Sequence, residues 1–405
     1  MKRTPHTKPR NRKPRSEVKP KSGAWKIRAL LSIVAVLLIG VFIAVFVTKT
    51  APEQSPIQIT SQKQTAKSPQ KPPPNTWEEL TKLSSNELAA QDIARVNLIC
   101  ALGLPGSEGV DLKTNLTTLS QMAEHIQRET ERHQYRFDKD PAEFENSKGK
   151  YRIMMMVTVL QQDFRLHYNT ERIWQEGTEN EPNEVFFANS ADIFIHGLIK
   201  HAGMGTCSSM PVLFAAIGRR LGYPIRLVKT KAHLYARWDG DGETFNIECT
   251  SLGFVSHNDE HYRAWPMPFS TVEEQSEGYL KSMNPDEEFS VFCQIRGACL
   301  QANQKHQESI TAFTEAYRRF PQSRGNLHML QRANRLYAAT TPEGRANLRL
   351  TALNQISIPN HPSYSAAQST KTRLSLMIGS GASEFEIEAE MAALNAELYS
   401  ARNRR

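Results

Sequence analysis

The chain has 405 residues, of which 39% are hydrophobic and 23% charged, and its formal net charge is +8. A chain of this length can bury a sizeable core without disulfides or a structural metal, and its five cysteines do not make a disulfide framework. No Cys/His spacing is typical of a zinc site and no glycine-rich loop could cradle a phosphate, so we expect no cofactor.

The excess of positive charge lies at the N-terminus. Residues 1–28 carry eleven Lys or Arg and one acidic residue, Glu17, which gives +10 and leaves the rest of the chain close to −2. Nucleic acid is one partner that such a tail could bind. Twenty uncharged residues, 29–48, follow directly, so contact with anionic lipid is the simpler explanation and we expect no nucleic-acid partner.

Residues 29–48 are predicted to be a transmembrane helix. At about 1.5 Å per residue they would span about 30 Å, the thickness of a bilayer core. The span is longer than the apolar part of a signal peptide and no small-residue cleavage site follows, which favours an uncleaved anchor. The positive-inside rule then places the tail 1–28 in the cytoplasm and the rest outside it. Residues 51–75, with six prolines, are predicted to form a semi-extended linker.

Residues 76–284 are predicted to form one domain with a helical N-terminal part. Thr76 and Glu79 make a capping-box pattern at its start. Apolar residues then recur at helical spacing in four segments: 88–102, 116–132, 151–168 and 187–200.

Cys207 lies in the segment 205–211, directly before another run with helical periodicity, 208–221. Pro211 is tolerated there because it falls in the first turn, and Gly222 ends the helix. Cys207 is therefore predicted at a helix N-terminus, where free N–H groups and the positive end of the helix dipole favour a thiolate.

Three strands are predicted next, at 225–228, 233–238 and 243–250. An Asp-Gly-Asp-Gly sequence joins the last two, which is a strong hairpin signal. A four-residue loop would pair Trp238 with Glu243 and, counting back, His233 with Glu248, with Cβ atoms about 4.5–5.5 Å apart. A slip of one residue would place the two side chains on opposite faces of the sheet.

Cys207, His233 and Glu248 are together the minimum set for thiolate chemistry. An imidazole beside a thiol lowers its pKa and shuttles a proton, and a carboxylate holds the ring in the right tautomer. Each residue alone has an ordinary interpretation, as a small buried cysteine, a core histidine or a solvated glutamate. His196 and His201 are alternative bases near Cys207. The three residues together favour a catalytic triad over these separate interpretations.

Beyond the hairpin, the polar segment 258–263 is interpreted equally as a helix start or as part of a substrate cleft. Residues 285–405 are predicted to be helical. A helix pair similar to a tetratricopeptide unit is expected near 291–321, on the positions Gly297, Leu300, Phe313, Ala316 and Pro321. A single unit needs neighbours to bury its faces. We therefore expect this region to buttress the core, with docking of a partner protein as the alternative.

These motifs resemble the bacterial transglutaminase-like superfamily. The resemblance rests on four segments, 205–211, 218–224, 232–234 and 246–250, and covers roughly residues 150–270. It implies an α+β fold with a papain-like core, in which a helix carrying the nucleophile packs on an antiparallel sheet. It also implies that Cys207 is the nucleophile, His233 the base and Glu248 the third member. The family usually has Asp at this last position, so the reach of the side chain differs here.

We expect from these observations a membrane-anchored cysteine enzyme acting outside the cytoplasm on a protein or peptide substrate. The reaction would be acyl transfer or hydrolysis at amide bonds through a thioester on Cys207. The backbone N–H of Cys207 would meet the oxyanion, together with a second donor that the sequence does not identify. Because the family also contains inactive members, the alternative is a cell-envelope binding module that uses the cleft and the C-terminal helices.

Overall fold

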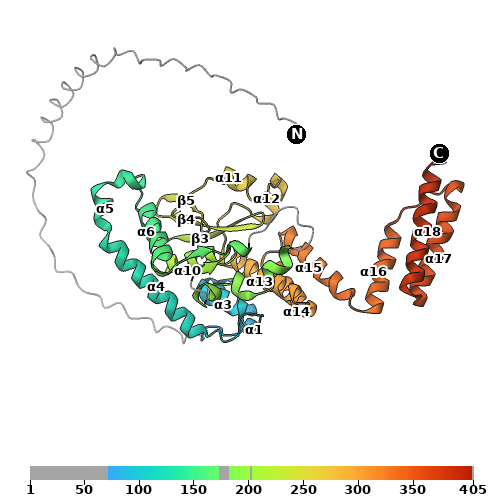
Figure 1. Cartoon of the computed structure of the whole chain (residues 1–405), viewed down its shortest axis with the longest axis horizontal. Coiled ribbons are helices and arrows are strands. Elements are labelled where there is room, and N and C mark those ends of the chain that lie inside the picture. Colours follow the sequence, from blue (N-terminus) through green and yellow to red (C-terminus); the bar gives the residue numbers. More distant parts are fainter. Residues whose placement is uncertain (1–71, 173–181, 201–202, 404–405) are drawn as a thin grey trace, which may run out of the picture. The chain divides into compact units, whose positions relative to one another are not determined.

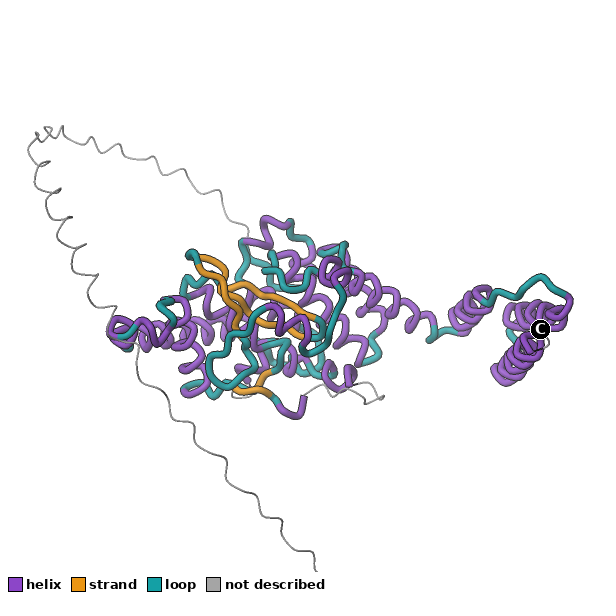
Figure 2. Tube along the Cα trace, turned by 90° about the horizontal axis from the view of Figure 1, so that it is seen from above, coloured by secondary structure: helices purple, strands orange, loops and turns teal. Residues whose placement is uncertain are grey.

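The computed structural model describes residues 72–172, 182–200 and 203–403 (Figure 1). The predicted tail 1–28, transmembrane helix 29–48 and nearly all of the linker 51–75 lie outside these residues. Within the described part of the chain, no helix is both long and apolar enough to cross a bilayer. The described residues form an α+β structure of many helices, one three-stranded sheet and one two-stranded sheet (Figure 2).

The elements follow one another in the order helices, sheet, helices. The described α-helices are α1 (Trp77–Thr81), α2 (Ser85–Ala89), α3 (Ile93–Ala101), α4 (Leu112–Arg132), α5 (Gln134–Lys139), α6 (Lys148–Gln162), α7 (Pro182–Phe187), α8 (Ser190–Ile193), α9 (Ile195–Lys200), α10 (Met210–Arg220), α11 (Asp259–Ala264), α12 (Thr271–Glu277), α13 (Pro285–Ala302), α14 (His306–Arg319), α15 (Arg324–Ala338), α16 (Pro342–Gln355), α17 (Ser365–Ser380) and α18 (Glu384–Asn403). The strands are β1 (His167–Tyr168), β2 (Met204–Gly205), β3 (Ile225–Thr230), β4 (His233–Gly240) and β5 (Glu243–Ile247), and the short 3-10 helices are η1 (Pro141–Phe144), η2 (Thr170–Arg172) and η3 (Pro362–Tyr364).

The predicted hairpin is present, but its predicted loop length and register are wrong. Gly240 pairs with Glu243, so the turn has two residues, Asp241 and Gly242, instead of four. Both have positive φ, at 56° and 78°, which is the backbone that a tight two-residue hairpin turn requires. The strand predicted at 225–228 is confirmed as β3, which continues to Thr230 and pairs antiparallel with β4.

The two faces of the three-stranded sheet have different partners. Leu234 and Ala236 of β4 belong to the main hydrophobic core, with helix α10 packed on that face (Figure 1). Successive side chains of a strand point to opposite faces. His233 and Tyr235 therefore face the other way, where the ring of Tyr235 stacks on Tyr262 of α11 at 3.9 Å. The sheet therefore lies between helix α10, which follows Cys207, and helix α11, which lies on the face that carries His233.

The helical lead-in forms as predicted in outline, with different boundaries. Thr76 caps α1 by accepting from the backbone N–H of Glu79. The segment predicted as helix 88–102 is divided, because Asp92 caps a new helix by accepting from the N–H of Ala94. The segment 187–200 is likewise broken by Phe194, whose backbone is extended.

The helix predicted at 151–168 ends at Gln162, so its last six residues are not helical. Arg165 has a positive φ of 56°, which no helix interior adopts. Tyr168 then lies in strand β1, which pairs in parallel with β2. The pairing partners are 37 residues further along the chain, so local periodicity could not reveal this strand.

The first helices of the C-terminal region belong to the main core. Phe289, Phe292 and Leu300 of α13 and Ala316 of α14 are buried in the same cluster as helix α10. Gly297 allows the close packing of α13 on α14, because a Cβ there would lie 2.7 Å from the ring of Phe313. This favours the interpretation that α13 and α14 buttress the core. The later helices α16, α17 and α18 have a hydrophobic cluster of their own.

The polar segment 258–263 forms the start of a helix. The side chain of Asn258 accepts from the backbone N–H of His261 and caps α11. Asp259 accepts from Arg237 at 2.7 Å and from Asn246 at 2.8 Å, which ties the helix to the sheet. The segment does not line the cavity described below.

Candidate active site

A tight turn positions Cys207 directly before helix α10. The backbone carbonyl of Thr206 accepts from the N–H groups of Ser209 (3.2 Å) and Met210 (2.9 Å). The N–H of Thr206 donates to Ser209 Oγ, and the N–H of Ser208 donates to Thr206 Oγ1. Four N–H groups are therefore satisfied within the turn, and that of Cys207 is not among them. The expectation that Cys207 lies at a helix N-terminus holds, with α10 beginning three residues later.

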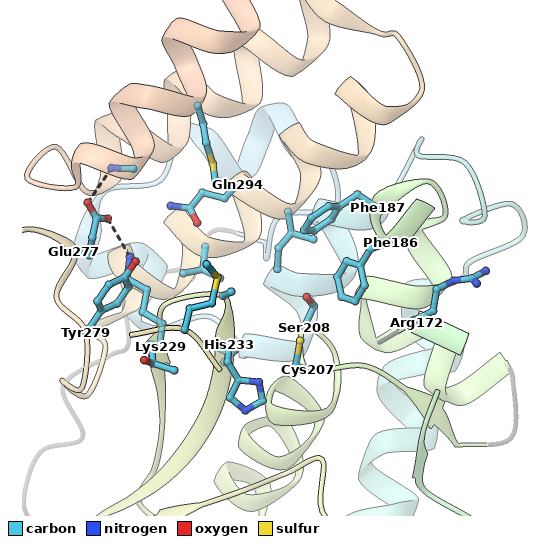
Figure 3. A pocket seen from close by; sticks show the side chains of 18 of the residues that line it. Arg172, Phe186, Phe187, Cys207, Ser208, Lys229, His233, Glu277, Tyr279 and Gln294 are labelled. Carbon is cyan, nitrogen blue, oxygen red and sulfur yellow. Dashed lines mark hydrogen bonds and ion pairs between the residues drawn. The ribbon is translucent and has the colours of Figure 1, made fainter. Parts of the chain in front are cut away.

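His233 lies between the thiol and the carboxylate. Its Nε2 atom is 3.0 Å from Oε2 of Glu248, and its ring also interacts with the side chain of Cys207. Since Nε2 faces the carboxylate, Nδ1 is the atom that faces the sulfur. All three predicted site residues are therefore brought together, and Figure 3 shows Cys207 and His233 on neighbouring elements.

The predicted contact between His233 and Glu248 is present although the predicted register was wrong. In the observed register, position 248 lies opposite Tyr235, and His233 is its diagonal neighbour. The register differs from the predicted one by two residues, and the side-chain period of a strand is also two. Both side chains therefore stay on the same face, and diagonal neighbours on one face are within reach of each other.

The Glu248 carboxylate accepts hydrogen bonds at both oxygens. Oε2 accepts from His233 and from the phenol of Tyr262 at 3.1 Å, while Oε1 accepts from the backbone N–H and the hydroxyl of Thr250. Burial would raise the pKa of this carboxyl, but the hydrogen bonds from His233 and Thr250 outweigh it and lower the pKa to about 2. Glu248 is therefore a carboxylate whose orientation is set from three sides.

The same contacts favour a protonated imidazole. Burial alone lowers the pKa of His233, because it penalises the charged ring. Hydrogen bonds with Cys207 and Glu248 overcome that effect and raise the pKa to about 9. The edge of the Trp265 ring also packs against the imidazole at 4.7 Å between centroids, which shields it from water. The arrangement can hold an imidazolium between two anions, which is the electrostatic basis of a thiolate nucleophile.

Tyr168 is a further group at the sulfur. Its phenol interacts with both the side chain and the backbone of Cys207. Burial and then the neighbouring charge of Cys207 raise its pKa, so the phenol keeps its proton. Sequence reasoning missed Tyr168 because it was assigned to a helix. It gave no role to Trp265, and it included Tyr262 and Thr250 only as members of the segments 258–263 and 246–250, without a contact to the triad.

A cavity of about 610 Å³ opens beside the triad (Figure 3). Cys207, Ser208 and His233 line one part of it, and Lys229, Glu277 and Tyr279 line another. Much of the remaining wall is apolar and comes from α7, α13 and α15: Phe186, Phe187, Val291, Ile295 and Met329. The C-terminal helices therefore contribute directly to the cavity and do more than buttress the core.

Two cations line the cavity and each is paired with a carboxylate, Lys229 with Glu277 and Arg172 with Asp192, while Glu171 adds a further acidic side chain. Lys229 is mostly covered, with Nζ 3.9 Å from Glu277 Oε2, and desolvation lowers its pKa. Glu277 accepts in addition from the Ser323 hydroxyl at 2.6 Å and from the Gly325 N–H at 2.9 Å. Because each cation is matched by a carboxylate, this wall does not select strongly for a charged group.

Cys207 differs from the other four cysteines in its accessibility. All five are free thiols, and Cys207 alone is not buried. Burial raises the pKa of each of the others: Cys100, Cys249, Cys293 and Cys299. A thiol-directed reagent should therefore reach Cys207 selectively. Among the described residues, no group of three or more His, Cys, Asp or Glu side chains could hold a metal ion.

Of the two alternative bases, His196 is not placed at the sulfur. His196 is buried, and its Nε2 is 3.1 Å from the hydroxyl of Ser190. It is not among the residues that line the cavity. His201 lies outside the described residues. Comparisons with protein-family models, with curated proteins and with solved structures gave no match.

Proposed function

We propose that the chain is a transglutaminase-like cysteine enzyme that transfers or hydrolyses acyl groups at amide bonds. The observation that carries the proposal is the imidazole of His233 held between the Cys207 thiol and the Glu248 carboxylate, beside a cavity. A helix that follows the nucleophile and packs on an antiparallel sheet supports the assignment to a papain-like core.

The chemistry follows from the positions of these groups. The Cys207 sulfur attacks the carbonyl carbon of the substrate and a C–S bond forms, while the carbonyl electron pair moves onto oxygen. The electron pair on the oxyanion then re-forms the C=O double bond, the C–N bond breaks, and His233 gives its proton to the leaving amine. Water or a second amine then attacks the thioester carbon, His233 takes up the proton that is released, and the C–S bond breaks to return the Cys207 thiolate. Glu248 holds the ring and stabilises its charge without entering bond making.

The cavity supports an apolar acyl group beside the scissile bond. Its wall contains aromatic and aliphatic side chains, and each of its cations is paired with a carboxylate. A protein or peptide substrate with an uncharged side chain at this position would therefore fit better than an acidic or basic one.

The proposal also includes a location for the enzyme, which rests on residues 29–48. An uncharged span of twenty residues after a tail of +10 supports anchoring in a membrane with the N-terminus in the cytoplasm. The catalytic domain would then act outside the cytoplasm, tethered by the linker 51–75.

The test is acylation of the full chain by a hexanoyl p-nitrophenyl ester, followed by intact mass spectrometry. We expect one hexanoyl group on Cys207, removable by hydroxylamine as a thioester. Cys207→Ala should give no adduct, and His233→Ala should acylate far more slowly. Cys299→Ala is the matched control, because it removes a buried thiol and should leave the adduct unchanged.

Equal acylation rates in the wild-type chain and His233→Ala would contradict the proposal. The sulfur would then react without help from the imidazole, as an unactivated surface thiol does. A non-catalytic binding module that keeps the cleft would become the better explanation.

A further inference from the structure

The proposed reaction leaves one requirement open, which is a second hydrogen-bond donor for the oxyanion. Attack by the Cys207 sulfur puts negative charge on the carbonyl oxygen of the substrate. The Cys207 N–H, which the turn leaves outside its own hydrogen bonds, supplies one donor. One donor is rarely enough, because such sites stabilise the oxyanion with preorganised groups placed about 2.7–3.1 Å from it.

Tyr168 is held at this point by backbone pairing. Strand β1 pairs in parallel with β2, with Tyr168 opposite Gly205, two residues before the nucleophile. The N–H of His167 donates to the Gly203 carbonyl at 3.0 Å, and the N–H of Asn169 donates to the Gly205 carbonyl at 2.7 Å. The backbone on both sides of Tyr168 is therefore tied to the segment that carries Cys207.

The phenol reaches both relevant atoms of the nucleophile. Tyr168 lines the cavity together with Cys207 and His233. Its hydroxyl lies close enough to interact with the side chain and the backbone of Cys207, and the backbone N–H is the group there that can donate to it. The phenol is therefore near the N–H that would donate to a carbonyl oxygen under attack.

We propose that Tyr168 is a catalytic residue whose phenol O–H is the second donor to the oxyanion. The inference rests on the proposed acyl-transfer function of the same site. An entering carbonyl oxygen accepts from the Cys207 N–H and lies beside the phenol. Because the backbone of Tyr168 is tied on both sides, the ring can turn only about its side-chain bonds and its O–H stays within reach. It then donates to the oxygen as the C–S bond forms.

Two reactions of the same sulfur separate this role from a structural one. Acylation by an ester passes through a tetrahedral oxyanion, whereas alkylation by iodoacetamide is a direct displacement at carbon and forms none. Both depend on the thiolate and on His233. A second oxyanion donor should therefore affect acylation and leave alkylation nearly unchanged.

The experiment measures both rates in the full chain and in Tyr168→Phe, with the hexanoyl p-nitrophenyl ester and iodoacetamide as probes. We expect acylation to fall by about 10²–10³-fold, as for the loss of one oxyanion donor, with little change in alkylation. Tyr223→Phe is the matched control, because it removes a buried phenol near the other end of helix α10 and should change neither rate.

Four results would overturn the inference. A parallel fall in both rates would mean that Tyr168 acts only on the thiolate. Faster acylation of Tyr168→Phe would mean that the phenol blocks the site. Unchanged acylation would mean that another group is the donor, although the proposed function would stand, since Cys207 would still form the thioester. No acylation of the wild-type chain would remove the proposed function and this inference with it.

Discussion

Replacement of Glu248 by glutamine tests whether the carboxylate maintains the charged form of His233. The rise in the pKa of His233 from about 6.5 to about 9 corresponds to roughly 3 kcal/mol, at about 1.4 kcal/mol per unit. Cys207 and Glu248 both contribute to this rise. If the carboxylate supplies about half, its loss lowers the population of the thiolate–imidazolium pair by roughly tenfold.

The hydrogen bonds of Glu248 make the loss larger than the charge alone suggests. Thr250 donates to Oε1 through both its N–H and its hydroxyl, so a glutamine would place its oxygen there. Its NH₂ group would then face Nε2 of His233, which would have to accept. The ring proton would move to Nδ1, and Nδ1 could no longer take the proton of the thiol.

The assay is the rate of Cys207 alkylation by iodoacetamide between pH 5 and pH 9, read by mass spectrometry of the full chain. Because the carboxylate favours the ion pair, Glu248→Gln should react at least about tenfold more slowly near pH 6. Its midpoint should move to higher pH, and the two rates should converge at alkaline pH. Glu288→Gln is the control, since it removes a buried carboxylate that binds Arg219 away from the triad. Superimposable profiles for the wild-type chain and Glu248→Gln would refute the reasoning.

Three further predictions concern the rest of the chain. Deleting residues 285–405 should prevent stable folding, because α13 buries several large apolar side chains in the main core, each worth about 1.5–3 kcal/mol. Deleting residues 341–405 should leave the melting temperature of the core nearly unchanged, since α16 to α18 have a separate cluster; a large fall in melting temperature would contradict this. A reporter enzyme fused after residue 405 should be active only outside the cytoplasm, and the mature chain should keep its N-terminus; activity inside the cell would exclude the proposed orientation.

The sequence alone determined the nucleophile turn, the hairpin and the shared face of His233 and Glu248. These are local properties: a cysteine before an apolar run with helical spacing, a turn sequence, and the alternation of side chains along a strand. The predicted loop was two residues too long, but the period of a strand is also two, so His233 and Glu248 were still placed on the same face of the sheet. The positions of Gly297 and Phe313 in the sequence likewise predicted a helix pair, which corresponds to α13 packed on α14.

Only the tertiary structure decided what surrounds these three residues. Tyr168 reaches Cys207 through a parallel pairing of two short strands, which leaves no periodic signal in either segment. Tyr262 reaches Glu248 because α11 folds back over the sheet, and the apolar wall of the cavity comes from α13 and α15, far along the chain. Contacts of this kind depend on which surfaces meet after the chain has folded, and the local pattern of residues does not encode that choice.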